Sequence, residues 1–165
     1  MNLDSVTTLF AGIPTDWLIL GVFAILAASE TFRSGARTAC VLALALPVGL
    51  VVFLAAENAA IIGSFVGQFS TATLQAVLLG ILIVAAYMVV NLIGLEWGGQ
   101  GGQTIQAALT GVALTAIVAT FWLATPALGE VWQFGPSVQE IFGESYRFFW
   151  LAGSYVALAF ARSSS

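Results

Sequence analysis

The chain contains no histidine, a single cysteine and few charged residues. Without histidine, neither a Ser-His-Asp triad nor a Cys-His pair can be assembled from this sequence. The one cysteine, Cys40, excludes a disulfide between two positions of the chain and a cluster of several cysteines around a metal. We therefore expect no metal and no cofactor, and we interpret Cys40, which lies in an apolar run, as a small core residue.

Charge is scarce and mostly negative. Four basic residues, all arginine, stand against eight Asp and Glu, which gives a net charge of −4. The basic patch that nucleic-acid binding requires is missing, so nucleic acid is not an expected partner. The carboxylates are scattered over loops and over the ends of apolar runs and form no acid-base pair. We therefore predict no catalytic residues and no enzyme activity.

Long apolar runs dominate the sequence. Hydrophobic residues make up 60% of the 165 positions and charged residues 7%, whereas a soluble domain carries about 25% charged residues. Four runs have the length of about 20 residues that a helix needs to cross a bilayer. The sequence thus predicts an all-α polytopic membrane protein, a single membrane domain over 1–165, with spans at about 16–32, 38–56, 74–95 and 104–124.

The last forty residues permit two interpretations. Residues 145–161 are apolar but only about 17 long, at the lower limit for a span. We favour a fifth span there, and the alternative is a re-entrant or interfacial helix. Residues 126–144 are predicted to form an outer loop with a short amphipathic helix. Its apolar side chains are expected to face the membrane and its polar ones water: Val138, Ile141 and Phe142 against Gln139 and Glu140.

The turn from Arg33 to Arg37 holds half of the arginines. By the positive-inside rule this turn is cytoplasmic, which places the N-terminus outside and, with five spans, the C-terminus inside. Glu30 and Arg33 are three residues apart at the inner end of the first span, so they can pair along the helix. We interpret this pair as structural, because both side chains can reach water at the interface.

Small residues recur on one face of the fourth span. Gly111, Thr115 and Ala119 lie at i, i+4 and i+8, a spacing that lets two helices approach closely in lipid. The first span carries Ala24 and Ala28 at the matching spacing. The sequence therefore predicts a helix-packing seam, whose partner is either the first span of the same chain or another subunit.

Two polar residues interrupt the spans. Glu57 follows the second span, which contains Pro47 as an expected bend. At 1.5 Å per residue Glu57 lies roughly 28 Å along a bilayer core about 30 Å thick, which indicates the outer interface. If the helix starts later, the carboxylate moves inward and becomes a candidate ion or proton site. Asn91, near the inner end of the third span, is expected to hydrogen-bond to a neighbouring helix.

Several features together resemble the colicin V production protein family of small inner-membrane proteins. They are Asp16 at the start of the first span, the turn from Arg33 to Arg37, the "VVNLIG" that closes the third span and a glycine-containing fourth span after a glycine-rich turn. Ser34 separates Arg33 from Gly35, where the family has the two adjacent. The resemblance implies about four spans, the bacterial inner membrane or one derived from it, and a role in envelope function and export.

Three functions are compatible with this sequence. The first is a non-enzymatic membrane subunit that packs with copies of itself or into a larger envelope or virion-membrane assembly, with the lipid bilayer as its other partner. The second is a holin-like pore former. The third is a small ion or proton channel that uses Glu57. The subunit is favoured, because a chain with so little extramembrane mass can do little besides pack, anchor or line a path.

Overall fold

The computed structural model describes residues 13–58, 71–92 and 104–163. Within these ranges the protein is all-α, and no strand occurs among the described residues, which confirms the predicted fold class. The helices are α2 (Thr15–Ser34), α3 (Arg37–Asn58), α5 (Ala72–Leu92), α6 (Thr104–Ala124), α7 (Pro126–Val131), α8 (Pro136–Phe142) and α9 (Arg147–Ser163).

Four of these helices are long and apolar enough to cross a membrane, as the sequence predicts. The protein is therefore a polytopic helical membrane protein. Helix α5 ends at Leu92, and the rest of the predicted third span, 93–95, lies outside the described residues. Helix α9 has 17 residues and is shorter than the other four. The four qualifying stretches are Thr15–Arg33, Arg37–Ala56, Ala72–Leu92 and Thr104–Ala124.

Proline and glycine set the helix ends. Pro14 is the N-cap of α2, and its carbonyl oxygen accepts the backbone N–H of Trp17 at 3.0 Å. Gly35 ends α2 with φ 78°, a conformation that a side chain disfavours, and its N–H donates to the Thr31 carbonyl at 2.8 Å. Pro126 and Pro136 begin α7 and α8, where the missing N–H costs no helical hydrogen bond.

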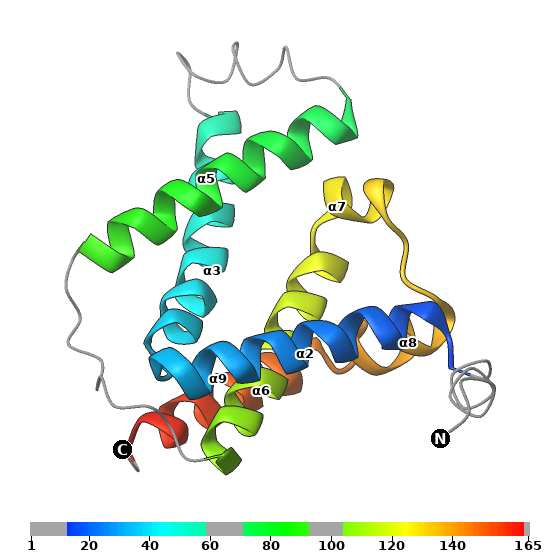
Figure 1. Ribbon diagram of the computed structural model, residues 1–165. Helices are drawn as coiled ribbons and strands as arrows, with labels where there is room; N and C mark the ends of the chain where they lie inside the picture. Colours follow the sequence, from blue (N-terminus) through cyan, green and yellow to red (C-terminus); the bar gives the residue numbers. More distant parts are fainter. Residues whose placement is uncertain (1–12, 59–70, 93–103, 164–165) are drawn as a thin grey trace, which may run out of the picture.

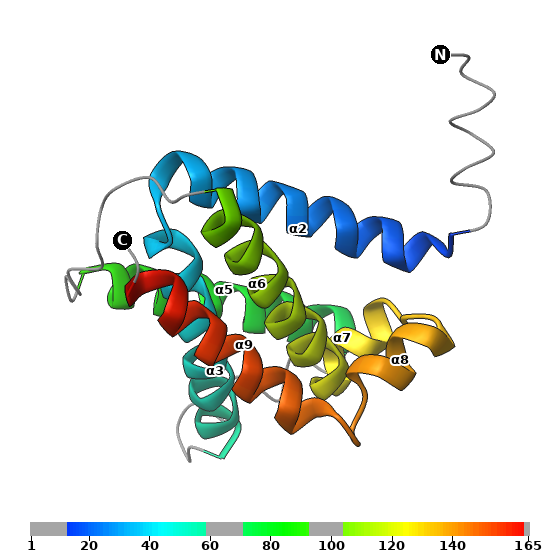
Figure 2. The same cartoon turned by 90° about the horizontal axis from the view of Figure 1, so that it is seen from below.

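Helix α6 is the centre of the fold. Of its apolar stretch, 56% is buried, against 11% for α2 and for α5. It packs most extensively against α2 and α9, which lie on opposite sides of it, and it also contacts α3, α7 and α8 (Figure 2). The side chains of α6 consequently enter both hydrophobic clusters that the described residues form.

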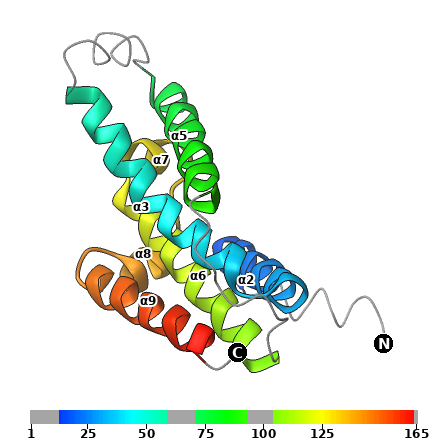
Figure 3. The same ribbon diagram turned by 90° about the vertical axis from the view of Figure 1, so that its left-hand side faces the viewer.

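Helices α3 and α5 form a second, outlying pair. Helix α3 diverges from α2 after the turn that contains Gly35, and α5 crosses α3 (Figure 1). The pair extends away from the group formed by α2, α6 and α9 (Figure 3), and α7 contacts α5. At the crossing, a Cβ added to Gly49 would lie 2.7 Å from Cγ1 and 2.9 Å from Cα of Ile83. Gly49 therefore permits an approach of the two helices that a larger residue would prevent.

Candidate functional site

The predicted small-residue seam lies between α6 and α2. A Cβ added to Gly111 would be 2.5 Å from the carbonyl oxygen of Ala24 and 2.8 Å from Cβ of Ala28. Thr115 and Ala119 are buried, with Ala119 wholly inaccessible to solvent. The structure thus brings Gly111 directly against α2 of the same chain, at the two alanines with matching spacing.

The threonines of α6 do not donate hydrogen bonds across this seam. The hydroxyl of Thr115 donates to the Gly111 carbonyl at 2.8 Å, and that of Thr120 to the Ala116 carbonyl at 2.7 Å. Both bonds stay within α6, one turn back along the helix. The contact between α2 and α6 is consequently defined by shape and close approach.

Three tryptophans hold the segment 126–142 against the bundle, and we call them the tryptophan clamp: Trp17, Trp122 and Trp150. Trp17 donates its indole N–H to the Ser137 hydroxyl at 3.1 Å. Trp122 donates to the Trp132 carbonyl at 3.0 Å, and Trp150 to the Ile141 carbonyl at 2.7 Å. The donors come from α2, α6 and α9, so one short segment ties three helices together.

A carboxylate strengthens this attachment. The backbone N–H of Gly135, at the start of α8, donates to the carboxylate of Asp16 in the first turn of α2. A carboxylate is a strong acceptor for a backbone N–H at the start of a helix. The sequence marks Asp16 only as the start of a span, and nothing in the chain order indicates that it bonds 119 residues away.

The structure corrects one part of the prediction for segment 126–144. The segment holds two short helices, α7 and α8, and Val138 and Phe142 are buried within the protein, whereas Ile141, Gln139 and Glu140 are exposed as that prediction requires. Val138 is 0% and Phe142 7% exposed, in a cluster with Leu20 of α2 and with Ala116 and Ala119 of α6. An amphipathic pattern predicts an apolar face but does not specify what covers it, and here the small side chains of α6 leave room for α8.

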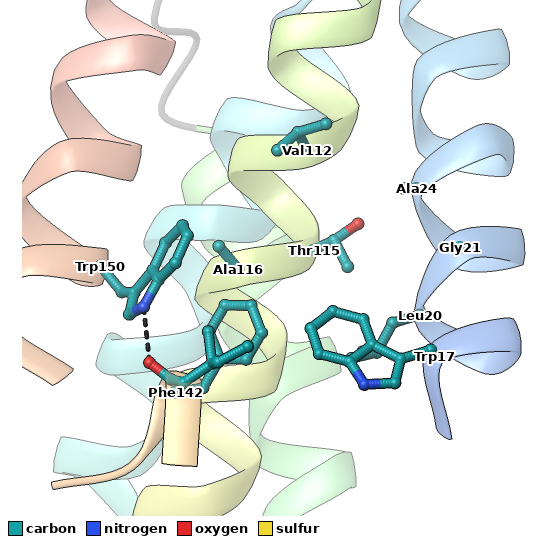
Figure 4. A pocket seen from close by; sticks show the side chains of 10 residues that line it. Trp17, Leu20, Gly21, Ala24, Val112, Thr115, Ala116, Phe142 and Trp150 are labelled. Carbon is teal, nitrogen blue, oxygen red and sulfur yellow. Dashed lines mark hydrogen bonds between the residues drawn. The ribbon is translucent and has the colours of Figure 1, made fainter. Parts of the chain in front are cut away.

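An apolar groove opens beside the clamp, between α2, α6, α8 and the start of α9 (Figure 4). Its volume is about 460 Å³. Phe142 lies between two clamp residues, with its ring centroid 6.3 Å from that of Trp17 and 4.7 Å from that of Trp150. Gly21 lines the groove from α2, and a Cβ added there would meet no atom within 4 Å.

The wall of this groove offers almost no free hydrogen-bonding capacity. Three of the lining side chains carry a polar atom, and all three bond within the chain: Thr115 to Gly111, Trp17 to Ser137 and Trp150 to Ile141. The remaining lining side chains are aliphatic, aromatic or absent, as at Gly21. The groove can therefore accept an apolar group by shape, and it carries no group suited to acid-base chemistry.

The predicted polar residues of the inner side lie in two places. Arg37, the first residue of α3, donates to the side-chain oxygen of Asn91 in the last turn of α5 at 3.2 Å. The bond to a neighbouring helix expected for Asn91 is present, and it joins two ends predicted to share one side of the membrane. Glu30 and Arg33 are both exposed near the end of α2. Their ion pair stays a prediction.

Glu57 is the next-to-last residue of α3 and follows the apolar stretch Arg37–Ala56. Its backbone thus lies at the end of the helix opposite Arg37. The side chain of Glu57 is outside the described part of the protein.

Among residues 13–58, 71–92 and 104–163, no three His, Cys, Asp or Glu side chains come together in a way that could hold a metal ion.

Two features of the site are not evident from sequence reasoning. From the sequence, Trp17 and the aromatic residues around Trp150 are expected at the membrane interface. The structure shows that the indole N–H groups of Trp17 and Trp150 also donate hydrogen bonds to the segment 126–142. The available signal is that a buried or half-buried indole usually finds an acceptor, but this does not identify which one.

The fold defines the class as an all-α multi-pass membrane protein. Comparisons with protein-family models, with curated proteins and with solved structures found no match.

Proposed function

We propose that the protein is a non-enzymatic integral membrane subunit that assembles with copies of itself or with other membrane proteins. The observation that carries the proposal is the apolar groove beside the tryptophan clamp. Its polar side-chain atoms bond within the chain, so it selects an occupant by van der Waals packing, which is one of the forces that associate helices in lipid. We propose that the groove receives an apolar side chain from a neighbouring helix.

The exposed faces of α2 and α5 support this proposal. Both helices are long enough to cross a bilayer, yet only 11% of each apolar stretch is buried within the chain. Their outward faces carry large apolar side chains, among them Ile25 at 69% and Met88 at 65% exposure. These surfaces fit lipid or another membrane helix. We further propose that the protein lies in the bacterial inner membrane and that the turn from Arg33 to Arg37 is cytoplasmic. We also propose that it takes part in an envelope assembly.

The substitution Gly21→Leu tests the groove. A leucine at this position has open space around its Cβ and fills the groove from α2. We expect the variant to fold like the parent and to lose affinity for its neighbour by about tenfold or more, which corresponds to about 1.4 kcal/mol. The measurement is cross-linking of the reconstituted protein, quantified over a range of protein-to-lipid ratios, together with native gels of extracted membranes.

The matched control is Gly80→Leu. Gly80 lies on α5, away from the groove, and a Cβ there also meets no atom within 4 Å. This variant adds the same bulk and the same apolarity to a span outside the groove, so it measures the effect of added bulk alone, and the groove proposal requires the loss of affinity in Gly21→Leu to exceed it. Assembly of Gly21→Leu at the parent's affinity would show that the groove does not receive the neighbouring helix.

A second test separates a subunit from a pore. The purified protein in liposomes is expected to leave a potassium-diffusion potential intact at the protein density that supports assembly. No continuous line of ionisable side chains crosses the described residues, so ions would have to cross apolar surface. A steady leak would contradict the subunit proposal. Loss of that leak in Glu57→Gln would then favour a channel, and an unchanged leak would favour a holin-like pore.

A further inference from the structure

Helix α3 contains a proline at a place where the helix continues on both sides. Pro47 is the eleventh residue of the 22-residue helix Arg37–Asn58. Because proline has no backbone N–H, the carbonyl of the residue four positions earlier loses its helical donor. That residue is Ala43, which is 1% exposed.

The vacated carbonyl has a donor from another helix. The hydroxyl of Tyr155, on α9, donates to the Ala43 carbonyl oxygen at 2.8 Å. The surroundings are apolar, since Ala43 belongs to a cluster with Cys40 of α3 and Leu158 of α9. An unsatisfied carbonyl in such a cluster would be costly, and in a bilayer no water replaces the missing partner.

We propose that Tyr155 is the donor that completes α3 at Pro47, and that this bond fastens α9 to the bundle as a strap. Ala43 lies six residues beyond Arg37, which corresponds to about 9 Å along the helix. Helix α9 packs mainly against α6, and the bond from Tyr155 adds a polar contact with α3 at this depth. The proline and the tyrosine thus act together: the missing N–H of Pro47 leaves the Ala43 carbonyl free to accept the bond that positions α9.

A double-mutant cycle tests this pairing. Tyr155→Phe removes only the hydroxyl, and Pro47→Ala restores an N–H that can donate to Ala43 within α3. In the parent, Tyr155→Phe should raise the unfolding equilibrium constant in mixed micelles about three- to twentyfold, the range found for hydrogen bonds between membrane helices. In the Pro47→Ala background the same change should raise it less than twofold, because the carbonyl already has a donor.

The thiol of Cys40 provides a local readout under native conditions. Cys40 is 4% exposed and lies in the cluster that Leu158 of α9 covers. If Tyr155→Phe loosens the strap, maleimide labels Cys40 about three- to twentyfold faster than in the parent, in step with the hydrogen-bond range given above. Tyr146→Phe is the matched control. The substitution removes the same phenol oxygen, but from the turn before α9, where Tyr146 is 54% exposed. It should leave the labelling rate unchanged.

Equal effects of Tyr155→Phe in the two backgrounds would overturn the proposal, because the hydroxyl would then act independently of the proline. The absence of an effect in both would overturn it as well. If Pro47→Ala does not fold, Pro47→Leu gives a second helix with a restored N–H. The side chain at position 47 is exposed, so a leucine there is accommodated outside the core.

Discussion

Gly111→Leu is expected to abolish the packing of α2 on α6 and to lower the free energy of unfolding by about 3 kcal/mol or more, at the upper end for overpacked sites. The reason is geometric. Even the first added atom would lie 2.5 Å from the Ala24 carbonyl oxygen and 2.8 Å from Cβ of Ala28, and backbone cannot move aside as a flexible side chain can. Equilibrium unfolding in mixed micelles, followed by circular dichroism, measures the loss.

Gly153→Leu on α9 is the control for Gly111→Leu. A Cβ added to Gly153 meets no atom within 4 Å, so the variant keeps the change in helix propensity and apolarity but causes no collision. It should unfold within about 1 kcal/mol of the parent, the scale of the helix-propensity difference. If Gly111→Leu were as stable as this control, α2 and α6 would not be in contact at Gly111.

Phe142→Ala is expected to destabilise the protein by about 3 kcal/mol, as large-to-small changes at buried aromatic residues do. Phe142 is 7% exposed and lies between Trp17 and Trp150. Its removal leaves a cavity at the point where α8 meets α2 and α9. The free energy of unfolding and the near-ultraviolet circular dichroism of the tryptophans should therefore change together, because the packing around the clamp is lost.

Phe148→Ala is the control: it makes the same chemical change at an exposed position. Phe148 is 74% exposed on α9, so its loss should leave the free energy of unfolding within about 0.5 kcal/mol of the parent. Comparable losses in the two variants would show that Phe142 faces lipid, as the amphipathic pattern of the segment alone predicts. A selective loss in Phe142→Ala would support the packing of α8 inside the bundle.

The helices follow from the sequence because length and apolarity leave few alternatives. A run of about 20 apolar residues in lipid has to satisfy its backbone hydrogen bonds internally, and a helix does so. Thr104 and Ala124 are accordingly both the predicted and the observed limits of α6. The spacing of Gly111, Ala24 and Ala28 also predicts which helices can pack closely, since close approach of two helices needs small residues at that interval.

The burial of α8 and the long-range hydrogen bonds could not be predicted, because they depend on which helix surfaces pack together. Val138 and Phe142 show an apolar face, and the same pattern fits lipid or a protein neighbour. Asp16 bonds to Gly135, and Tyr155 bonds to Ala43, across separations in the chain of 119 and 112 residues. Pro47 does indicate a carbonyl in need of a donor, but the sequence contains several hydroxyls that could fill that role.

The position of Gly111 against Ala24 has a consequence for biogenesis. The α2 segment is synthesised first, but its main partner, α6, emerges from the ribosome about 90 residues later. During that interval α3 and α5 can already pair extensively with each other, whereas α2 has only its smaller contact with α3. Nascent chains that stop before Thr104 should therefore carry α2 without its main partner, and quality-control proteases of the membrane would meet it in this state.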